Sequence, residues 1–221
     1  MSTPPPTSTS PSPSGRLAIP VAHGQLEAIL KAPASPVAAA VICHPHPLGG
    51  GTMNNNVVYR AAKALNEAGL AVLRFNFRGV GASTGRYDGD TGEEEDALAA
   101  LELLAQRYPG LPLWMAGFSF GARVGLTVGA RDARIEKLIG IGLALRMFDY
   151  HFLDACEKPK AIIQGTNDEY GGLAEIEAAV ATMAPPTRLW VVDGASHLFP
   201  QHLAELESAA AAAAVWLTAD P

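Results

Sequence analysis

One segment carries the clearest signal in the sequence: Leu111-Pro-Leu-Trp-Met-Ala-Gly-Phe-Ser-Phe-Gly-Ala-Arg123. An apolar run, Leu113 to Ala116, leads into Gly117-Phe-Ser-Phe-Gly121, and a helical segment of small residues, Ala122 to Ala130, follows at once. The motif Gly-x-Ser-x-Gly forms a nucleophile elbow when it follows a strand and precedes a helix, which is the order found here. The two glycines leave room for a sharp turn that strains the serine backbone and exposes its hydroxyl. We therefore interpret Ser119 as the candidate nucleophile.

The length and composition of the chain are those of a globular α/β protein. The chain has 221 residues, of which 48% are hydrophobic and 17% charged, enough to bury a sizeable core in one domain. A net charge of −6 and a pI near 5.5 argue against binding to nucleic acid or to an anionic membrane surface. No apolar run approaches the roughly 18 residues that are needed to span a bilayer.

The first residues differ in composition from the rest of the chain. Residues 1–15 are rich in Pro, Ser and Thr, and they lack the basic start and apolar block of a secretory signal. We expect 1–15 to be a disordered tail and 16–221 to form a single domain. Without a signal the protein is expected in the cytoplasm, where Cys43 and Cys156 would stay reduced.

The remaining sequence alternates between predicted strands and predicted helices. Two alternating segments on either side of His23-Gly24 predict an antiparallel hairpin at the edge of a sheet. Short apolar runs, typical of strands covered on both faces, lie at 37–43, 70–75, 113–116, 138–141, 160–164 and 188–192. Helical segments separate these runs. The pattern predicts a mostly parallel sheet with helices on both faces, an α/β fold.

The segment after the strand 70–75 predicts a loop followed by a helix. Thr91-Gly-Glu-Glu94 is typical of a capping box at the start of that helix. In the loop, Arg78 is expected to form a salt bridge to Glu93 or Asp96. The helix is expected to turn three leucines inward: Leu98, Leu101 and Leu104.

Two residues after later strands can complete the chemistry of a serine nucleophile. A serine hydroxyl attacks well only when a base removes its proton, and that base is commonly a histidine oriented by a carboxylate. Asp168 and His197 each follow a predicted strand, in loops expected at the edge of the sheet where Ser119 emerges. The order Ser119, Asp168, His197 is the order that this architecture imposes. Asp193 and Glu169 remain alternatives for the carboxylate.

Attack on a carbonyl also forms an oxyanion, which needs preorganised N–H donors worth about 3–4 kcal/mol each. The amide of Phe120, directly after the nucleophile, is one expected donor. The second is expected from the loop 44–51, which follows the strand predicted beside the elbow strand. The two prolines of that loop have no N–H, which leaves His46 or Leu48, and we prefer His46.

With the elbow, the order of the three residues and two glycine-rich loops in place, the sequence resembles the α/β-hydrolase superfamily. Within it, the chain resembles the small esterases of the dienelactone-hydrolase-like branch, from about Arg16 to the C-terminus. The motifs that carry the resemblance are Cys43-His-Pro-His-Pro-Leu-Gly-Gly-Gly51, Arg74-Phe-Asn-Phe-Arg-Gly-Val-Gly81, Gly117-Phe-Ser-Phe-Gly121, Gly165-Thr-Asn-Asp168 and Gly194-Ala-Ser-His197.

The resemblance implies an eight-stranded, mostly parallel sheet and serine ester hydrolysis without a metal or an organic cofactor. Dienelactone enzymes carry Cys at the elbow, whereas this chain has Ser119, so ordinary carboxylic esters are the expected substrates.

Family members often insert a helical cap after the strand that follows the elbow helix. Only Gly142 to Pro159 separates the two strands here, which is too short for a cap domain. We therefore expect an open site that accepts small or medium acyl esters. The candidate pocket residues are Met147, Phe148, Tyr150 and Phe152, although these side chains could instead pack a crossover segment onto the sheet.

Other functions use the same features. The same three residues serve thioesterases, amidases and peptidases, and a hydrolase fold can also be a non-catalytic binding protein. Nucleotide binding is disfavoured because in Gly79-Val-Gly-Ala-Ser-Thr-Gly85 the third glycine is one place late for a dinucleotide fingerprint. The sequence predicts neither a monomer nor a homodimer in preference to the other.

Overall fold

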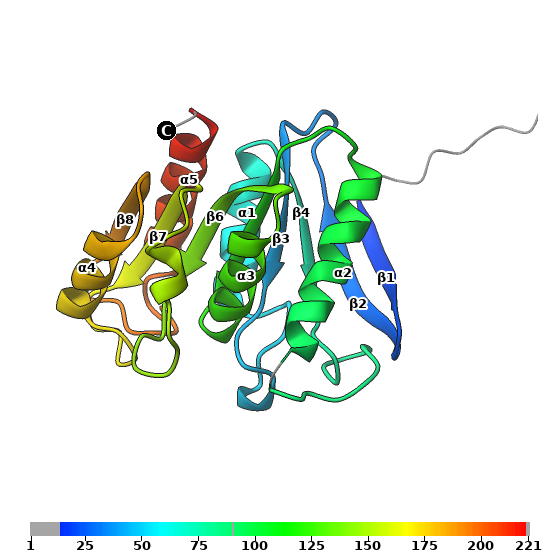
Figure 1. The fold of residues 1–221 in the computed structure, drawn as a ribbon, viewed down its shortest axis with the longest axis horizontal. Coiled ribbons are helices and arrows are strands. Elements are labelled where there is room, and N and C mark those ends of the chain that lie inside the picture. Colours follow the sequence, from blue (N-terminus) through cyan, green and yellow to red (C-terminus); the bar gives the residue numbers. More distant parts are fainter. Residues whose placement is uncertain (1–13, 90, 220–221) are drawn as a thin grey trace, which may run out of the picture.

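The computed structural model describes residues 14–89 and 91–219, which form one eight-stranded sheet with helices on both faces (Figure 1). The strands lie in the order β1-β2-β4-β3-β5-β6-β7-β8. Their bounds are β1 (Gly15–Val21), β2 (Gly24–Lys31), β3 (Ala38–Cys43), β4 (Leu70–Phe75), β5 (Leu113–Phe118), β6 (Ile135–Ile141), β7 (Lys160–Gly165) and β8 (Thr187–Val192). Neighbouring strands from β4 across to β8 are parallel. β2 pairs antiparallel with both of its neighbours, β1 and β4. The predicted fold class is confirmed.

The N-terminal hairpin begins one residue earlier than expected. Residues 1–13 of the predicted tail lie outside the described residues. Gly15, the last residue of that tail, is already the first residue of β1 and pairs with Leu30. The strand register then continues to the turn at His23, so the antiparallel hairpin itself is confirmed.

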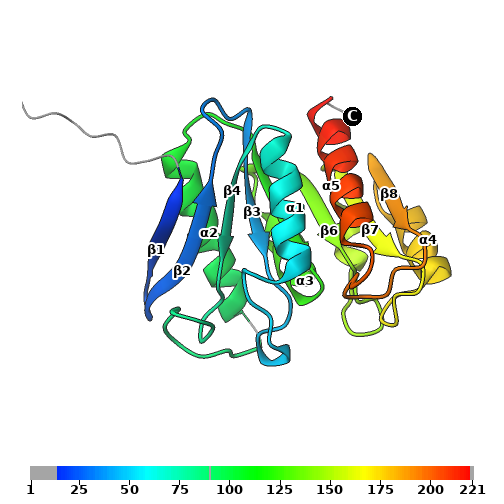
Figure 2. The ribbon, with the colours of Figure 1, turned by 180° about the vertical axis from the view of Figure 1, so that it is seen from behind.

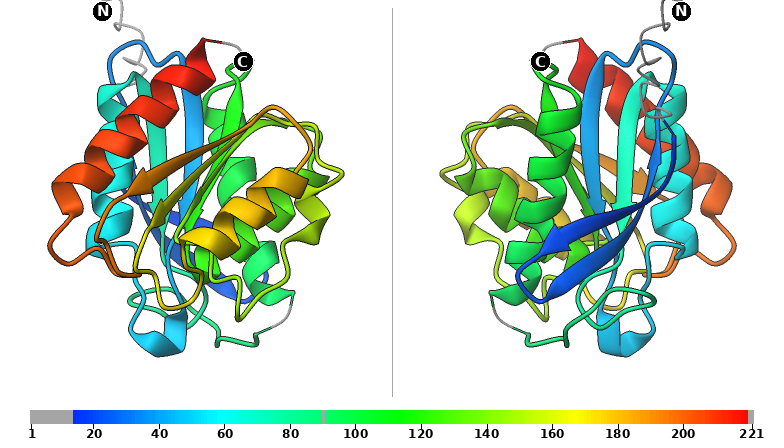
Figure 3. Two further views of the ribbon diagram at one scale, coloured as in Figure 1. Left: turned by 90° about the vertical axis from the view of Figure 1, so that its left-hand side faces the viewer. Right: turned by 90° about the vertical axis from the view of Figure 1, so that its right-hand side faces the viewer.

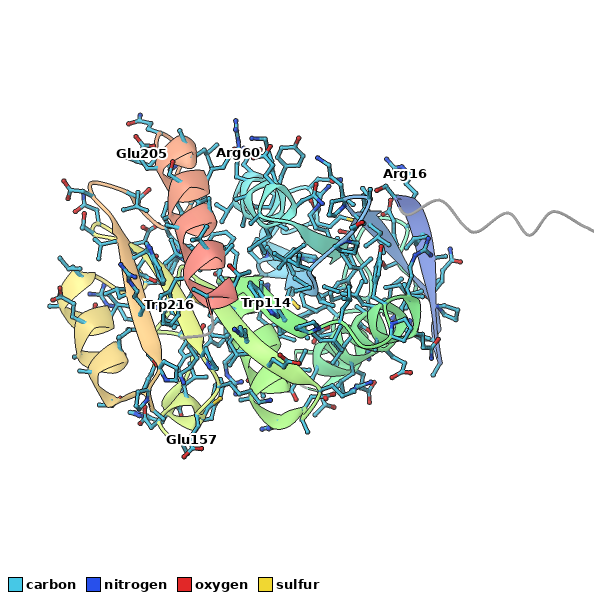
Figure 4. The ribbon with its side chains drawn as sticks, turned by 90° about the horizontal axis from the view of Figure 1, so that it is seen from above. Arg16, Arg60, Trp114, Glu157, Glu205 and Trp216 are labelled. Atoms are coloured by element: carbon cyan, nitrogen blue, oxygen red, sulfur yellow. The ribbon has the colours of Figure 1, made fainter. Side chains whose placement is uncertain are left out.

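The helices form two layers (Figures 2 and 3). Their bounds are α1 (Asn56–Glu67), α2 (Gly92–Arg107), α3 (Phe120–Arg131), α4 (Leu173–Thr182) and α5 (Leu203–Thr218), with short 3-10 helices η1 (Pro47–Gly49) and η2 (His151–Leu153). Figure 4 shows α1 and α5 on one side of the sheet and α2, α3 and α4 on the other. None of the helices in the described ranges is long and apolar enough to cross a membrane.

The elbow strand β5 takes part in both layers of the core. Its side chains alternate between the two faces because successive residues of a strand point in opposite directions. Leu113 and Met115 pack with α2 and α3, whereas Trp114 and Phe118 pack with α1 and α5. All six residues of β5 are buried, which explains why the strand appears in the sequence as a continuous apolar run.

The start of α2 differs from the expected capping box. The Thr91 side chain makes no capping hydrogen bond, and the Asp88 carboxylate accepts from the Gly92 amide instead, at 3.3 Å. Glu93 turns back to accept from the amides of Asp88 and Gly89. The Asp88 carboxylate, in the preceding loop, therefore caps the N-terminus of α2 in place of the expected Thr91 hydroxyl.

The inward face of α2 also differs from the prediction. Leu101 and Leu104 are buried as expected, but the Leu98 side chain is 40% exposed. Ala97 and Ala100 occupy the inward positions in its place. These four inward residues follow the spacing of one helical face, and the small alanines let the helix lie close to the sheet.

The loop between β4 and α2 is tied to the fold by Arg78. Of the two expected partners, Asp96 is confirmed: its buried carboxylate accepts from the Arg78 amide at 2.7 Å and from the guanidinium Nη2 at 2.8 Å. Glu93 is not a partner of this guanidinium in the described residues; Glu95 and Asp88 lie near it instead. His23 Nε2 also lies 3.1 Å from Asp96, so one carboxylate joins the hairpin turn, the loop and α2.

Replacing Arg78 with alanine is expected to lower the free energy of unfolding by about 3–5 kcal/mol, because it strands a buried carboxylate. The measurement is urea-induced unfolding. Arg16→Ala is the control, because Arg16 forms an exposed pair with Glu27 that is worth at most about 1 kcal/mol. Equal losses in the two variants would show that the Asp96 network does not hold the loop.

Candidate active site

The elbow at the end of β5 exists because its glycines have no side chains. A Cβ on Gly117 would lie 2.1 Å from the Gly121 carbonyl oxygen, and a Cβ on Gly121 would lie 2.3 Å from the Cys43 carbonyl oxygen. Both contacts are with backbone, which cannot move aside cheaply. Between them Ser119 has φ 57° and ψ −121°, a backbone conformation that residues other than glycine rarely adopt. Ser119 therefore sits at the N-terminus of α3, at the carboxyl edge of the sheet.

Two loops bring a histidine and an aspartate to this serine. His197 Nε2 lies 2.8 Å from Ser119 Oγ, and His197 Nδ1 lies 2.8 Å from Asp168 Oδ2. The imidazole and the carboxylate are almost fully buried, whereas the serine is partly exposed. The structure thus aligns the three residues that the sequence singled out, across separations of 78 and 29 positions.

Asp168 is held by groups that were not predicted. Gln164 Nε2 donates to Asp168 Oδ2 at 2.9 Å, and the Tyr170 amide donates to Oδ1 at 2.8 Å. Gln164 is itself fixed, because its Oε1 accepts from the Leu143 amide and its Nε2 also donates to the Gly171 carbonyl. The signal in the sequence was a glutamine that directly follows the buried apolar residues Ala161, Ile162 and Ile163.

The alternative carboxylates have other partners. Glu169 Oε2 accepts from the backbone amide of His197 at 3.1 Å, so it holds the residue and not its ring. Asp193 Oδ1 accepts from the Thr166 hydroxyl at 3.3 Å. Neither carboxylate hydrogen-bonds to the imidazole, whereas Asp168 does.

His44 is a buried structural residue. Its Nδ1 donates to the Pro45 carbonyl at 2.6 Å, and its Nε2 accepts from the Phe77 amide at 3.0 Å. Burial lowers the pKa of His44 to about 4, although the bond to Pro45 acts in the opposite direction. The neutral ring connects the loop after β3 to the loop after β4.

The loop after β3 is arranged around the side chain of His46. His46 Nδ1 accepts from the Leu48 amide at 3.2 Å, so the ring proton is assigned to Nε2, which then donates to the Tyr87 hydroxyl at 3.1 Å. Burial lowers the pKa of His46, which favours this neutral form. The ring also packs against Phe120, with centroids 5.0 Å apart.

Of the three amides expected as oxyanion donors, those of Phe120 and His46 have no hydrogen-bond acceptor within the described ranges. The Leu48 amide, the other expected donor, is already used by His46 Nδ1, and the Leu48 side chain is 77% exposed. Phe120 and His46 both line the cavity that contains Ser119, whereas Leu48 does not.

That cavity has a volume of about 350 Å³ and includes Ser119 and His197. Of the predicted pocket residues, Met147 and Phe148 line it, but Tyr150 and Phe152 do not. Tyr150 is buried beside a neighbouring cavity, and the Phe152 ring lies under the Arg123 guanidinium. The chain turns through η2 at this point, so the two aromatics pack against α3 and the core instead. Leu198 and Tyr170 line the cavity in their place.

The segment from Gly142 to Pro159, between β6 and β7, contains η2 and no longer helix. The expectation that the domain has no cap is therefore confirmed. Across residues 14–89 and 91–219, no group of three or more His, Cys, Asp or Glu side chains is arranged to hold a metal ion.

Comparison with known proteins identifies the family to which the chain belongs. Residues 38–216 match the family described as alpha/beta hydrolase domain, and the chain belongs to this family. An alpha-beta serine hydrolase homologue from Coxiella burnetii is 40% identical, with a TM-score of 0.82, over 90% of this chain and 96% of that one. A serine hydrolase without lid from Xanthomonas campestris is 34% identical, with a TM-score of 0.85, over 96% and 99%.

An uncharacterized protein of Rickettsia prowazekii is 36% identical over 85% of this chain and 83% of its own length. Dienelactone hydrolase from Anabaena variabilis shares the fold, with a TM-score of 0.76, at 20% identity over 93% of this chain and 97% of that one. The resemblance to lidless alpha/beta serine hydrolases is thus confirmed, and the likeness to dienelactone hydrolase is confirmed for the fold.

The loop after β3 allows a matched test of its packing. A Cβ on Gly51 would lie 2.1 Å from the Pro45 carbonyl oxygen, whereas a Cβ on Gly49 would meet nothing closer than 3.8 Å. We expect Gly51→Ala to lower the free energy of unfolding by about 1–3 kcal/mol. Gly49→Ala is expected to change it by less than about 0.5 kcal/mol. Urea-induced unfolding measures both, and an undisturbed Gly51→Ala would contradict this packing.

Proposed function

We propose that the protein is a serine carboxylesterase that cleaves small to medium acyl esters. The observation that carries the proposal is the hydrogen-bonded line from Ser119 through His197 to Asp168, with 2.8 Å at each step. This line ends on a strained elbow at a helix N-terminus, which is the arrangement of a serine nucleophile. Membership of a family that contains serine hydrolases supports the same assignment.

In this mechanism Ser119 Oγ attacks the ester carbonyl carbon while its proton passes to His197 Nε2. Asp168 accepts the Nδ1–H, which fixes the tautomer and stabilises the imidazolium. Collapse of the tetrahedral intermediate breaks the bond to the alcohol, which leaves with the proton from His197. Water then attacks the acyl-enzyme with His197 as base, and release of the carboxylic acid restores Ser119.

The amides of Phe120 and His46 are the proposed donors to the oxyanion. Both line the cavity and lack another acceptor in the described part of the chain, so both are available when charge develops. The Phe120 amide also lies in the first turn of α3, where the helix dipole favours negative charge. His46 is preferred over Leu48 because the Leu48 amide is already engaged.

The substrate class follows from the site itself. The cavity at Ser119 is open and about 350 Å³ in volume, at the small end of the range of about 300–1,000 Å³ for small-molecule sites. Glu169 is the only Asp, Glu, Lys or Arg among its lining residues, and Glu169 Oε2 accepts from the His197 amide. An uncharged ester with a small acyl group fits this environment.

The assignment is tested by labelling with a fluorophosphonate and by hydrolysis of 4-nitrophenyl esters. We expect the label on Ser119 in the folded protein, and a fall in kcat of at least about 10⁴-fold in Ser119→Ala. Ser208→Ala, an exposed serine on α5, is the control and should keep full activity. Labelling that persists in Ser119→Ala, or a native chain that resists the label, would overturn the proposal.

Tyr87→Phe is expected to lower kcat about threefold to tenfold with little change in KM. The variant removes the hydroxyl that accepts from His46 Nε2, so the proposed oxyanion amide of His46 is held less firmly; one neutral hydrogen bond is worth about 0.5–1.5 kcal/mol. Steady-state kinetics with a 4-nitrophenyl ester measures the effect. Tyr59→Phe, on the exposed surface of α1, is the control, and equal kcat values in the two variants would remove Tyr87 from this role.

A further inference from the structure

A second cavity lies beside the one that contains Ser119. It has a volume of about 760 Å³ and is formed between the segment 145–154 and α4. Met147 and Phe148 line both cavities, so the two cavities adjoin at these side chains. The Met147 side chain is 56% exposed and stands at the surface between the two openings.

The walls of the second cavity are mainly apolar. They are formed by Leu145, Phe148, Tyr150, Ala178, Ala179 and Met183. Burial raises the pKa of Tyr150, so this phenol stays neutral over the physiological pH range. The interior therefore offers contact area and no charge.

Of the five Arg, His, Asp and Glu side chains that line this cavity, four are paired with one another. Arg146 Nη2 lies 2.8 Å from Glu175, and the His151 ring lies 3.0 Å from Asp154. Asp149 accepts from the backbone amide of His151 at 2.8 Å. An anionic ligand would have to displace Glu175 from Arg146, the only Arg or Lys that lines the cavity, whereas a neutral apolar group would displace nothing. The rim thus favours an uncharged occupant over an anion.

The wall of this cavity is attached to the loop that carries Asp168. The Arg146 amide donates to the Tyr170 carbonyl at 3.0 Å, and Arg146 Nη1 donates to the Glu169 carbonyl at 2.8 Å. The second cavity and the Asp168 loop therefore hold a fixed position relative to each other without a bound ligand. A group bound there would be anchored with respect to the reacting centre.

Building on the proposed ester hydrolysis, we propose that the second cavity binds an uncharged alkyl chain of the ester, remote from the reacting carbonyl. The cavity at Ser119 has room for the reacting carbonyl and a short chain, and a longer chain crosses Met147 into the larger space. Remote contacts of this kind raise kcat/KM because they anchor the ester for attack.

The test fills the second cavity and leaves the first one unchanged. Ala178 is exposed on α4 and lines the cavity, whereas Ala181 is exposed on the same helix and does not. The substrates are 4-nitrophenyl acetate, 4-nitrophenyl octanoate and octyl acetate. Relative to the first, the second has a longer acyl chain, and the third has an alkyl chain on the alcohol side of the ester. Thermal unfolding establishes that each variant is folded.

We expect Ala178→Phe to lower kcat/KM roughly tenfold or more for octanoate or for octyl acetate, since each buried methylene contributes a factor of several. The acetate rate should change less than twofold, and Ala181→Phe should leave all three rates unchanged. Ala178→Leu, a smaller replacement, is expected to act in the same direction if the phenylalanine is poorly tolerated.

Long-ester rates in folded Ala178→Phe and Ala178→Leu that equal those of Ala181→Phe would overturn the second cavity as a binding site. Failure of the unmodified chain to hydrolyse 4-nitrophenyl acetate would be a different result. It would overturn the proposed esterase activity, and the inference with it.

Discussion

The site depends on how closely the backbone of Gly121 approaches the end of β3. The space that a Cβ on Gly121 would need is occupied by the carbonyl oxygens of Cys43 and His44. This contact places the first turn of α3 against the loop after β3, so that the amides of Phe120 and His46 border one cavity. It also requires the turn that forces Ser119 to a positive φ. One short backbone contact thus sets the positions of the hydroxyl and of two N–H donors together.

Several polar groups around this contact are hydrogen-bonded to one another. Gln164 orients Asp168, Asp168 orients His197, and Glu169 holds the backbone of His197. His46 is held by Leu48 and Tyr87 in the same manner. Because a buried polar group without a partner is costly, such chains specify one arrangement more sharply than apolar packing does. The geometry of the site is therefore set before any ligand binds.

The sequence predicted those features that follow from local pattern and from chain order. The apolar run before Gly117 and the loops after β7 and β8 sufficed to select Ser119, Asp168 and His197, because parallel strands end at one edge of the sheet. Contacts between distant loops carry no such periodicity. The contact of His46 with Tyr87, 41 positions away, is of this kind. Gln164 and the Asp88 cap of α2 reach partners only four positions away, but through loop conformations that no periodic pattern predicts. Phe152 lines neither cavity and Tyr150 lines only the cavity beside the one that contains Ser119, since the direction of each side chain depends on the η2 turn.

The strained elbow also has a consequence for the energy of the whole molecule. A residue with a side chain at φ 57° costs on the order of 1–3 kcal/mol, and glycine would adopt the same conformation with little penalty. The free energy of unfolding is thus lower than it would be with glycine at this position. Glycine at this position would relieve the strain and raise the free energy of unfolding, but the chain would then lack the hydroxyl that faces His197.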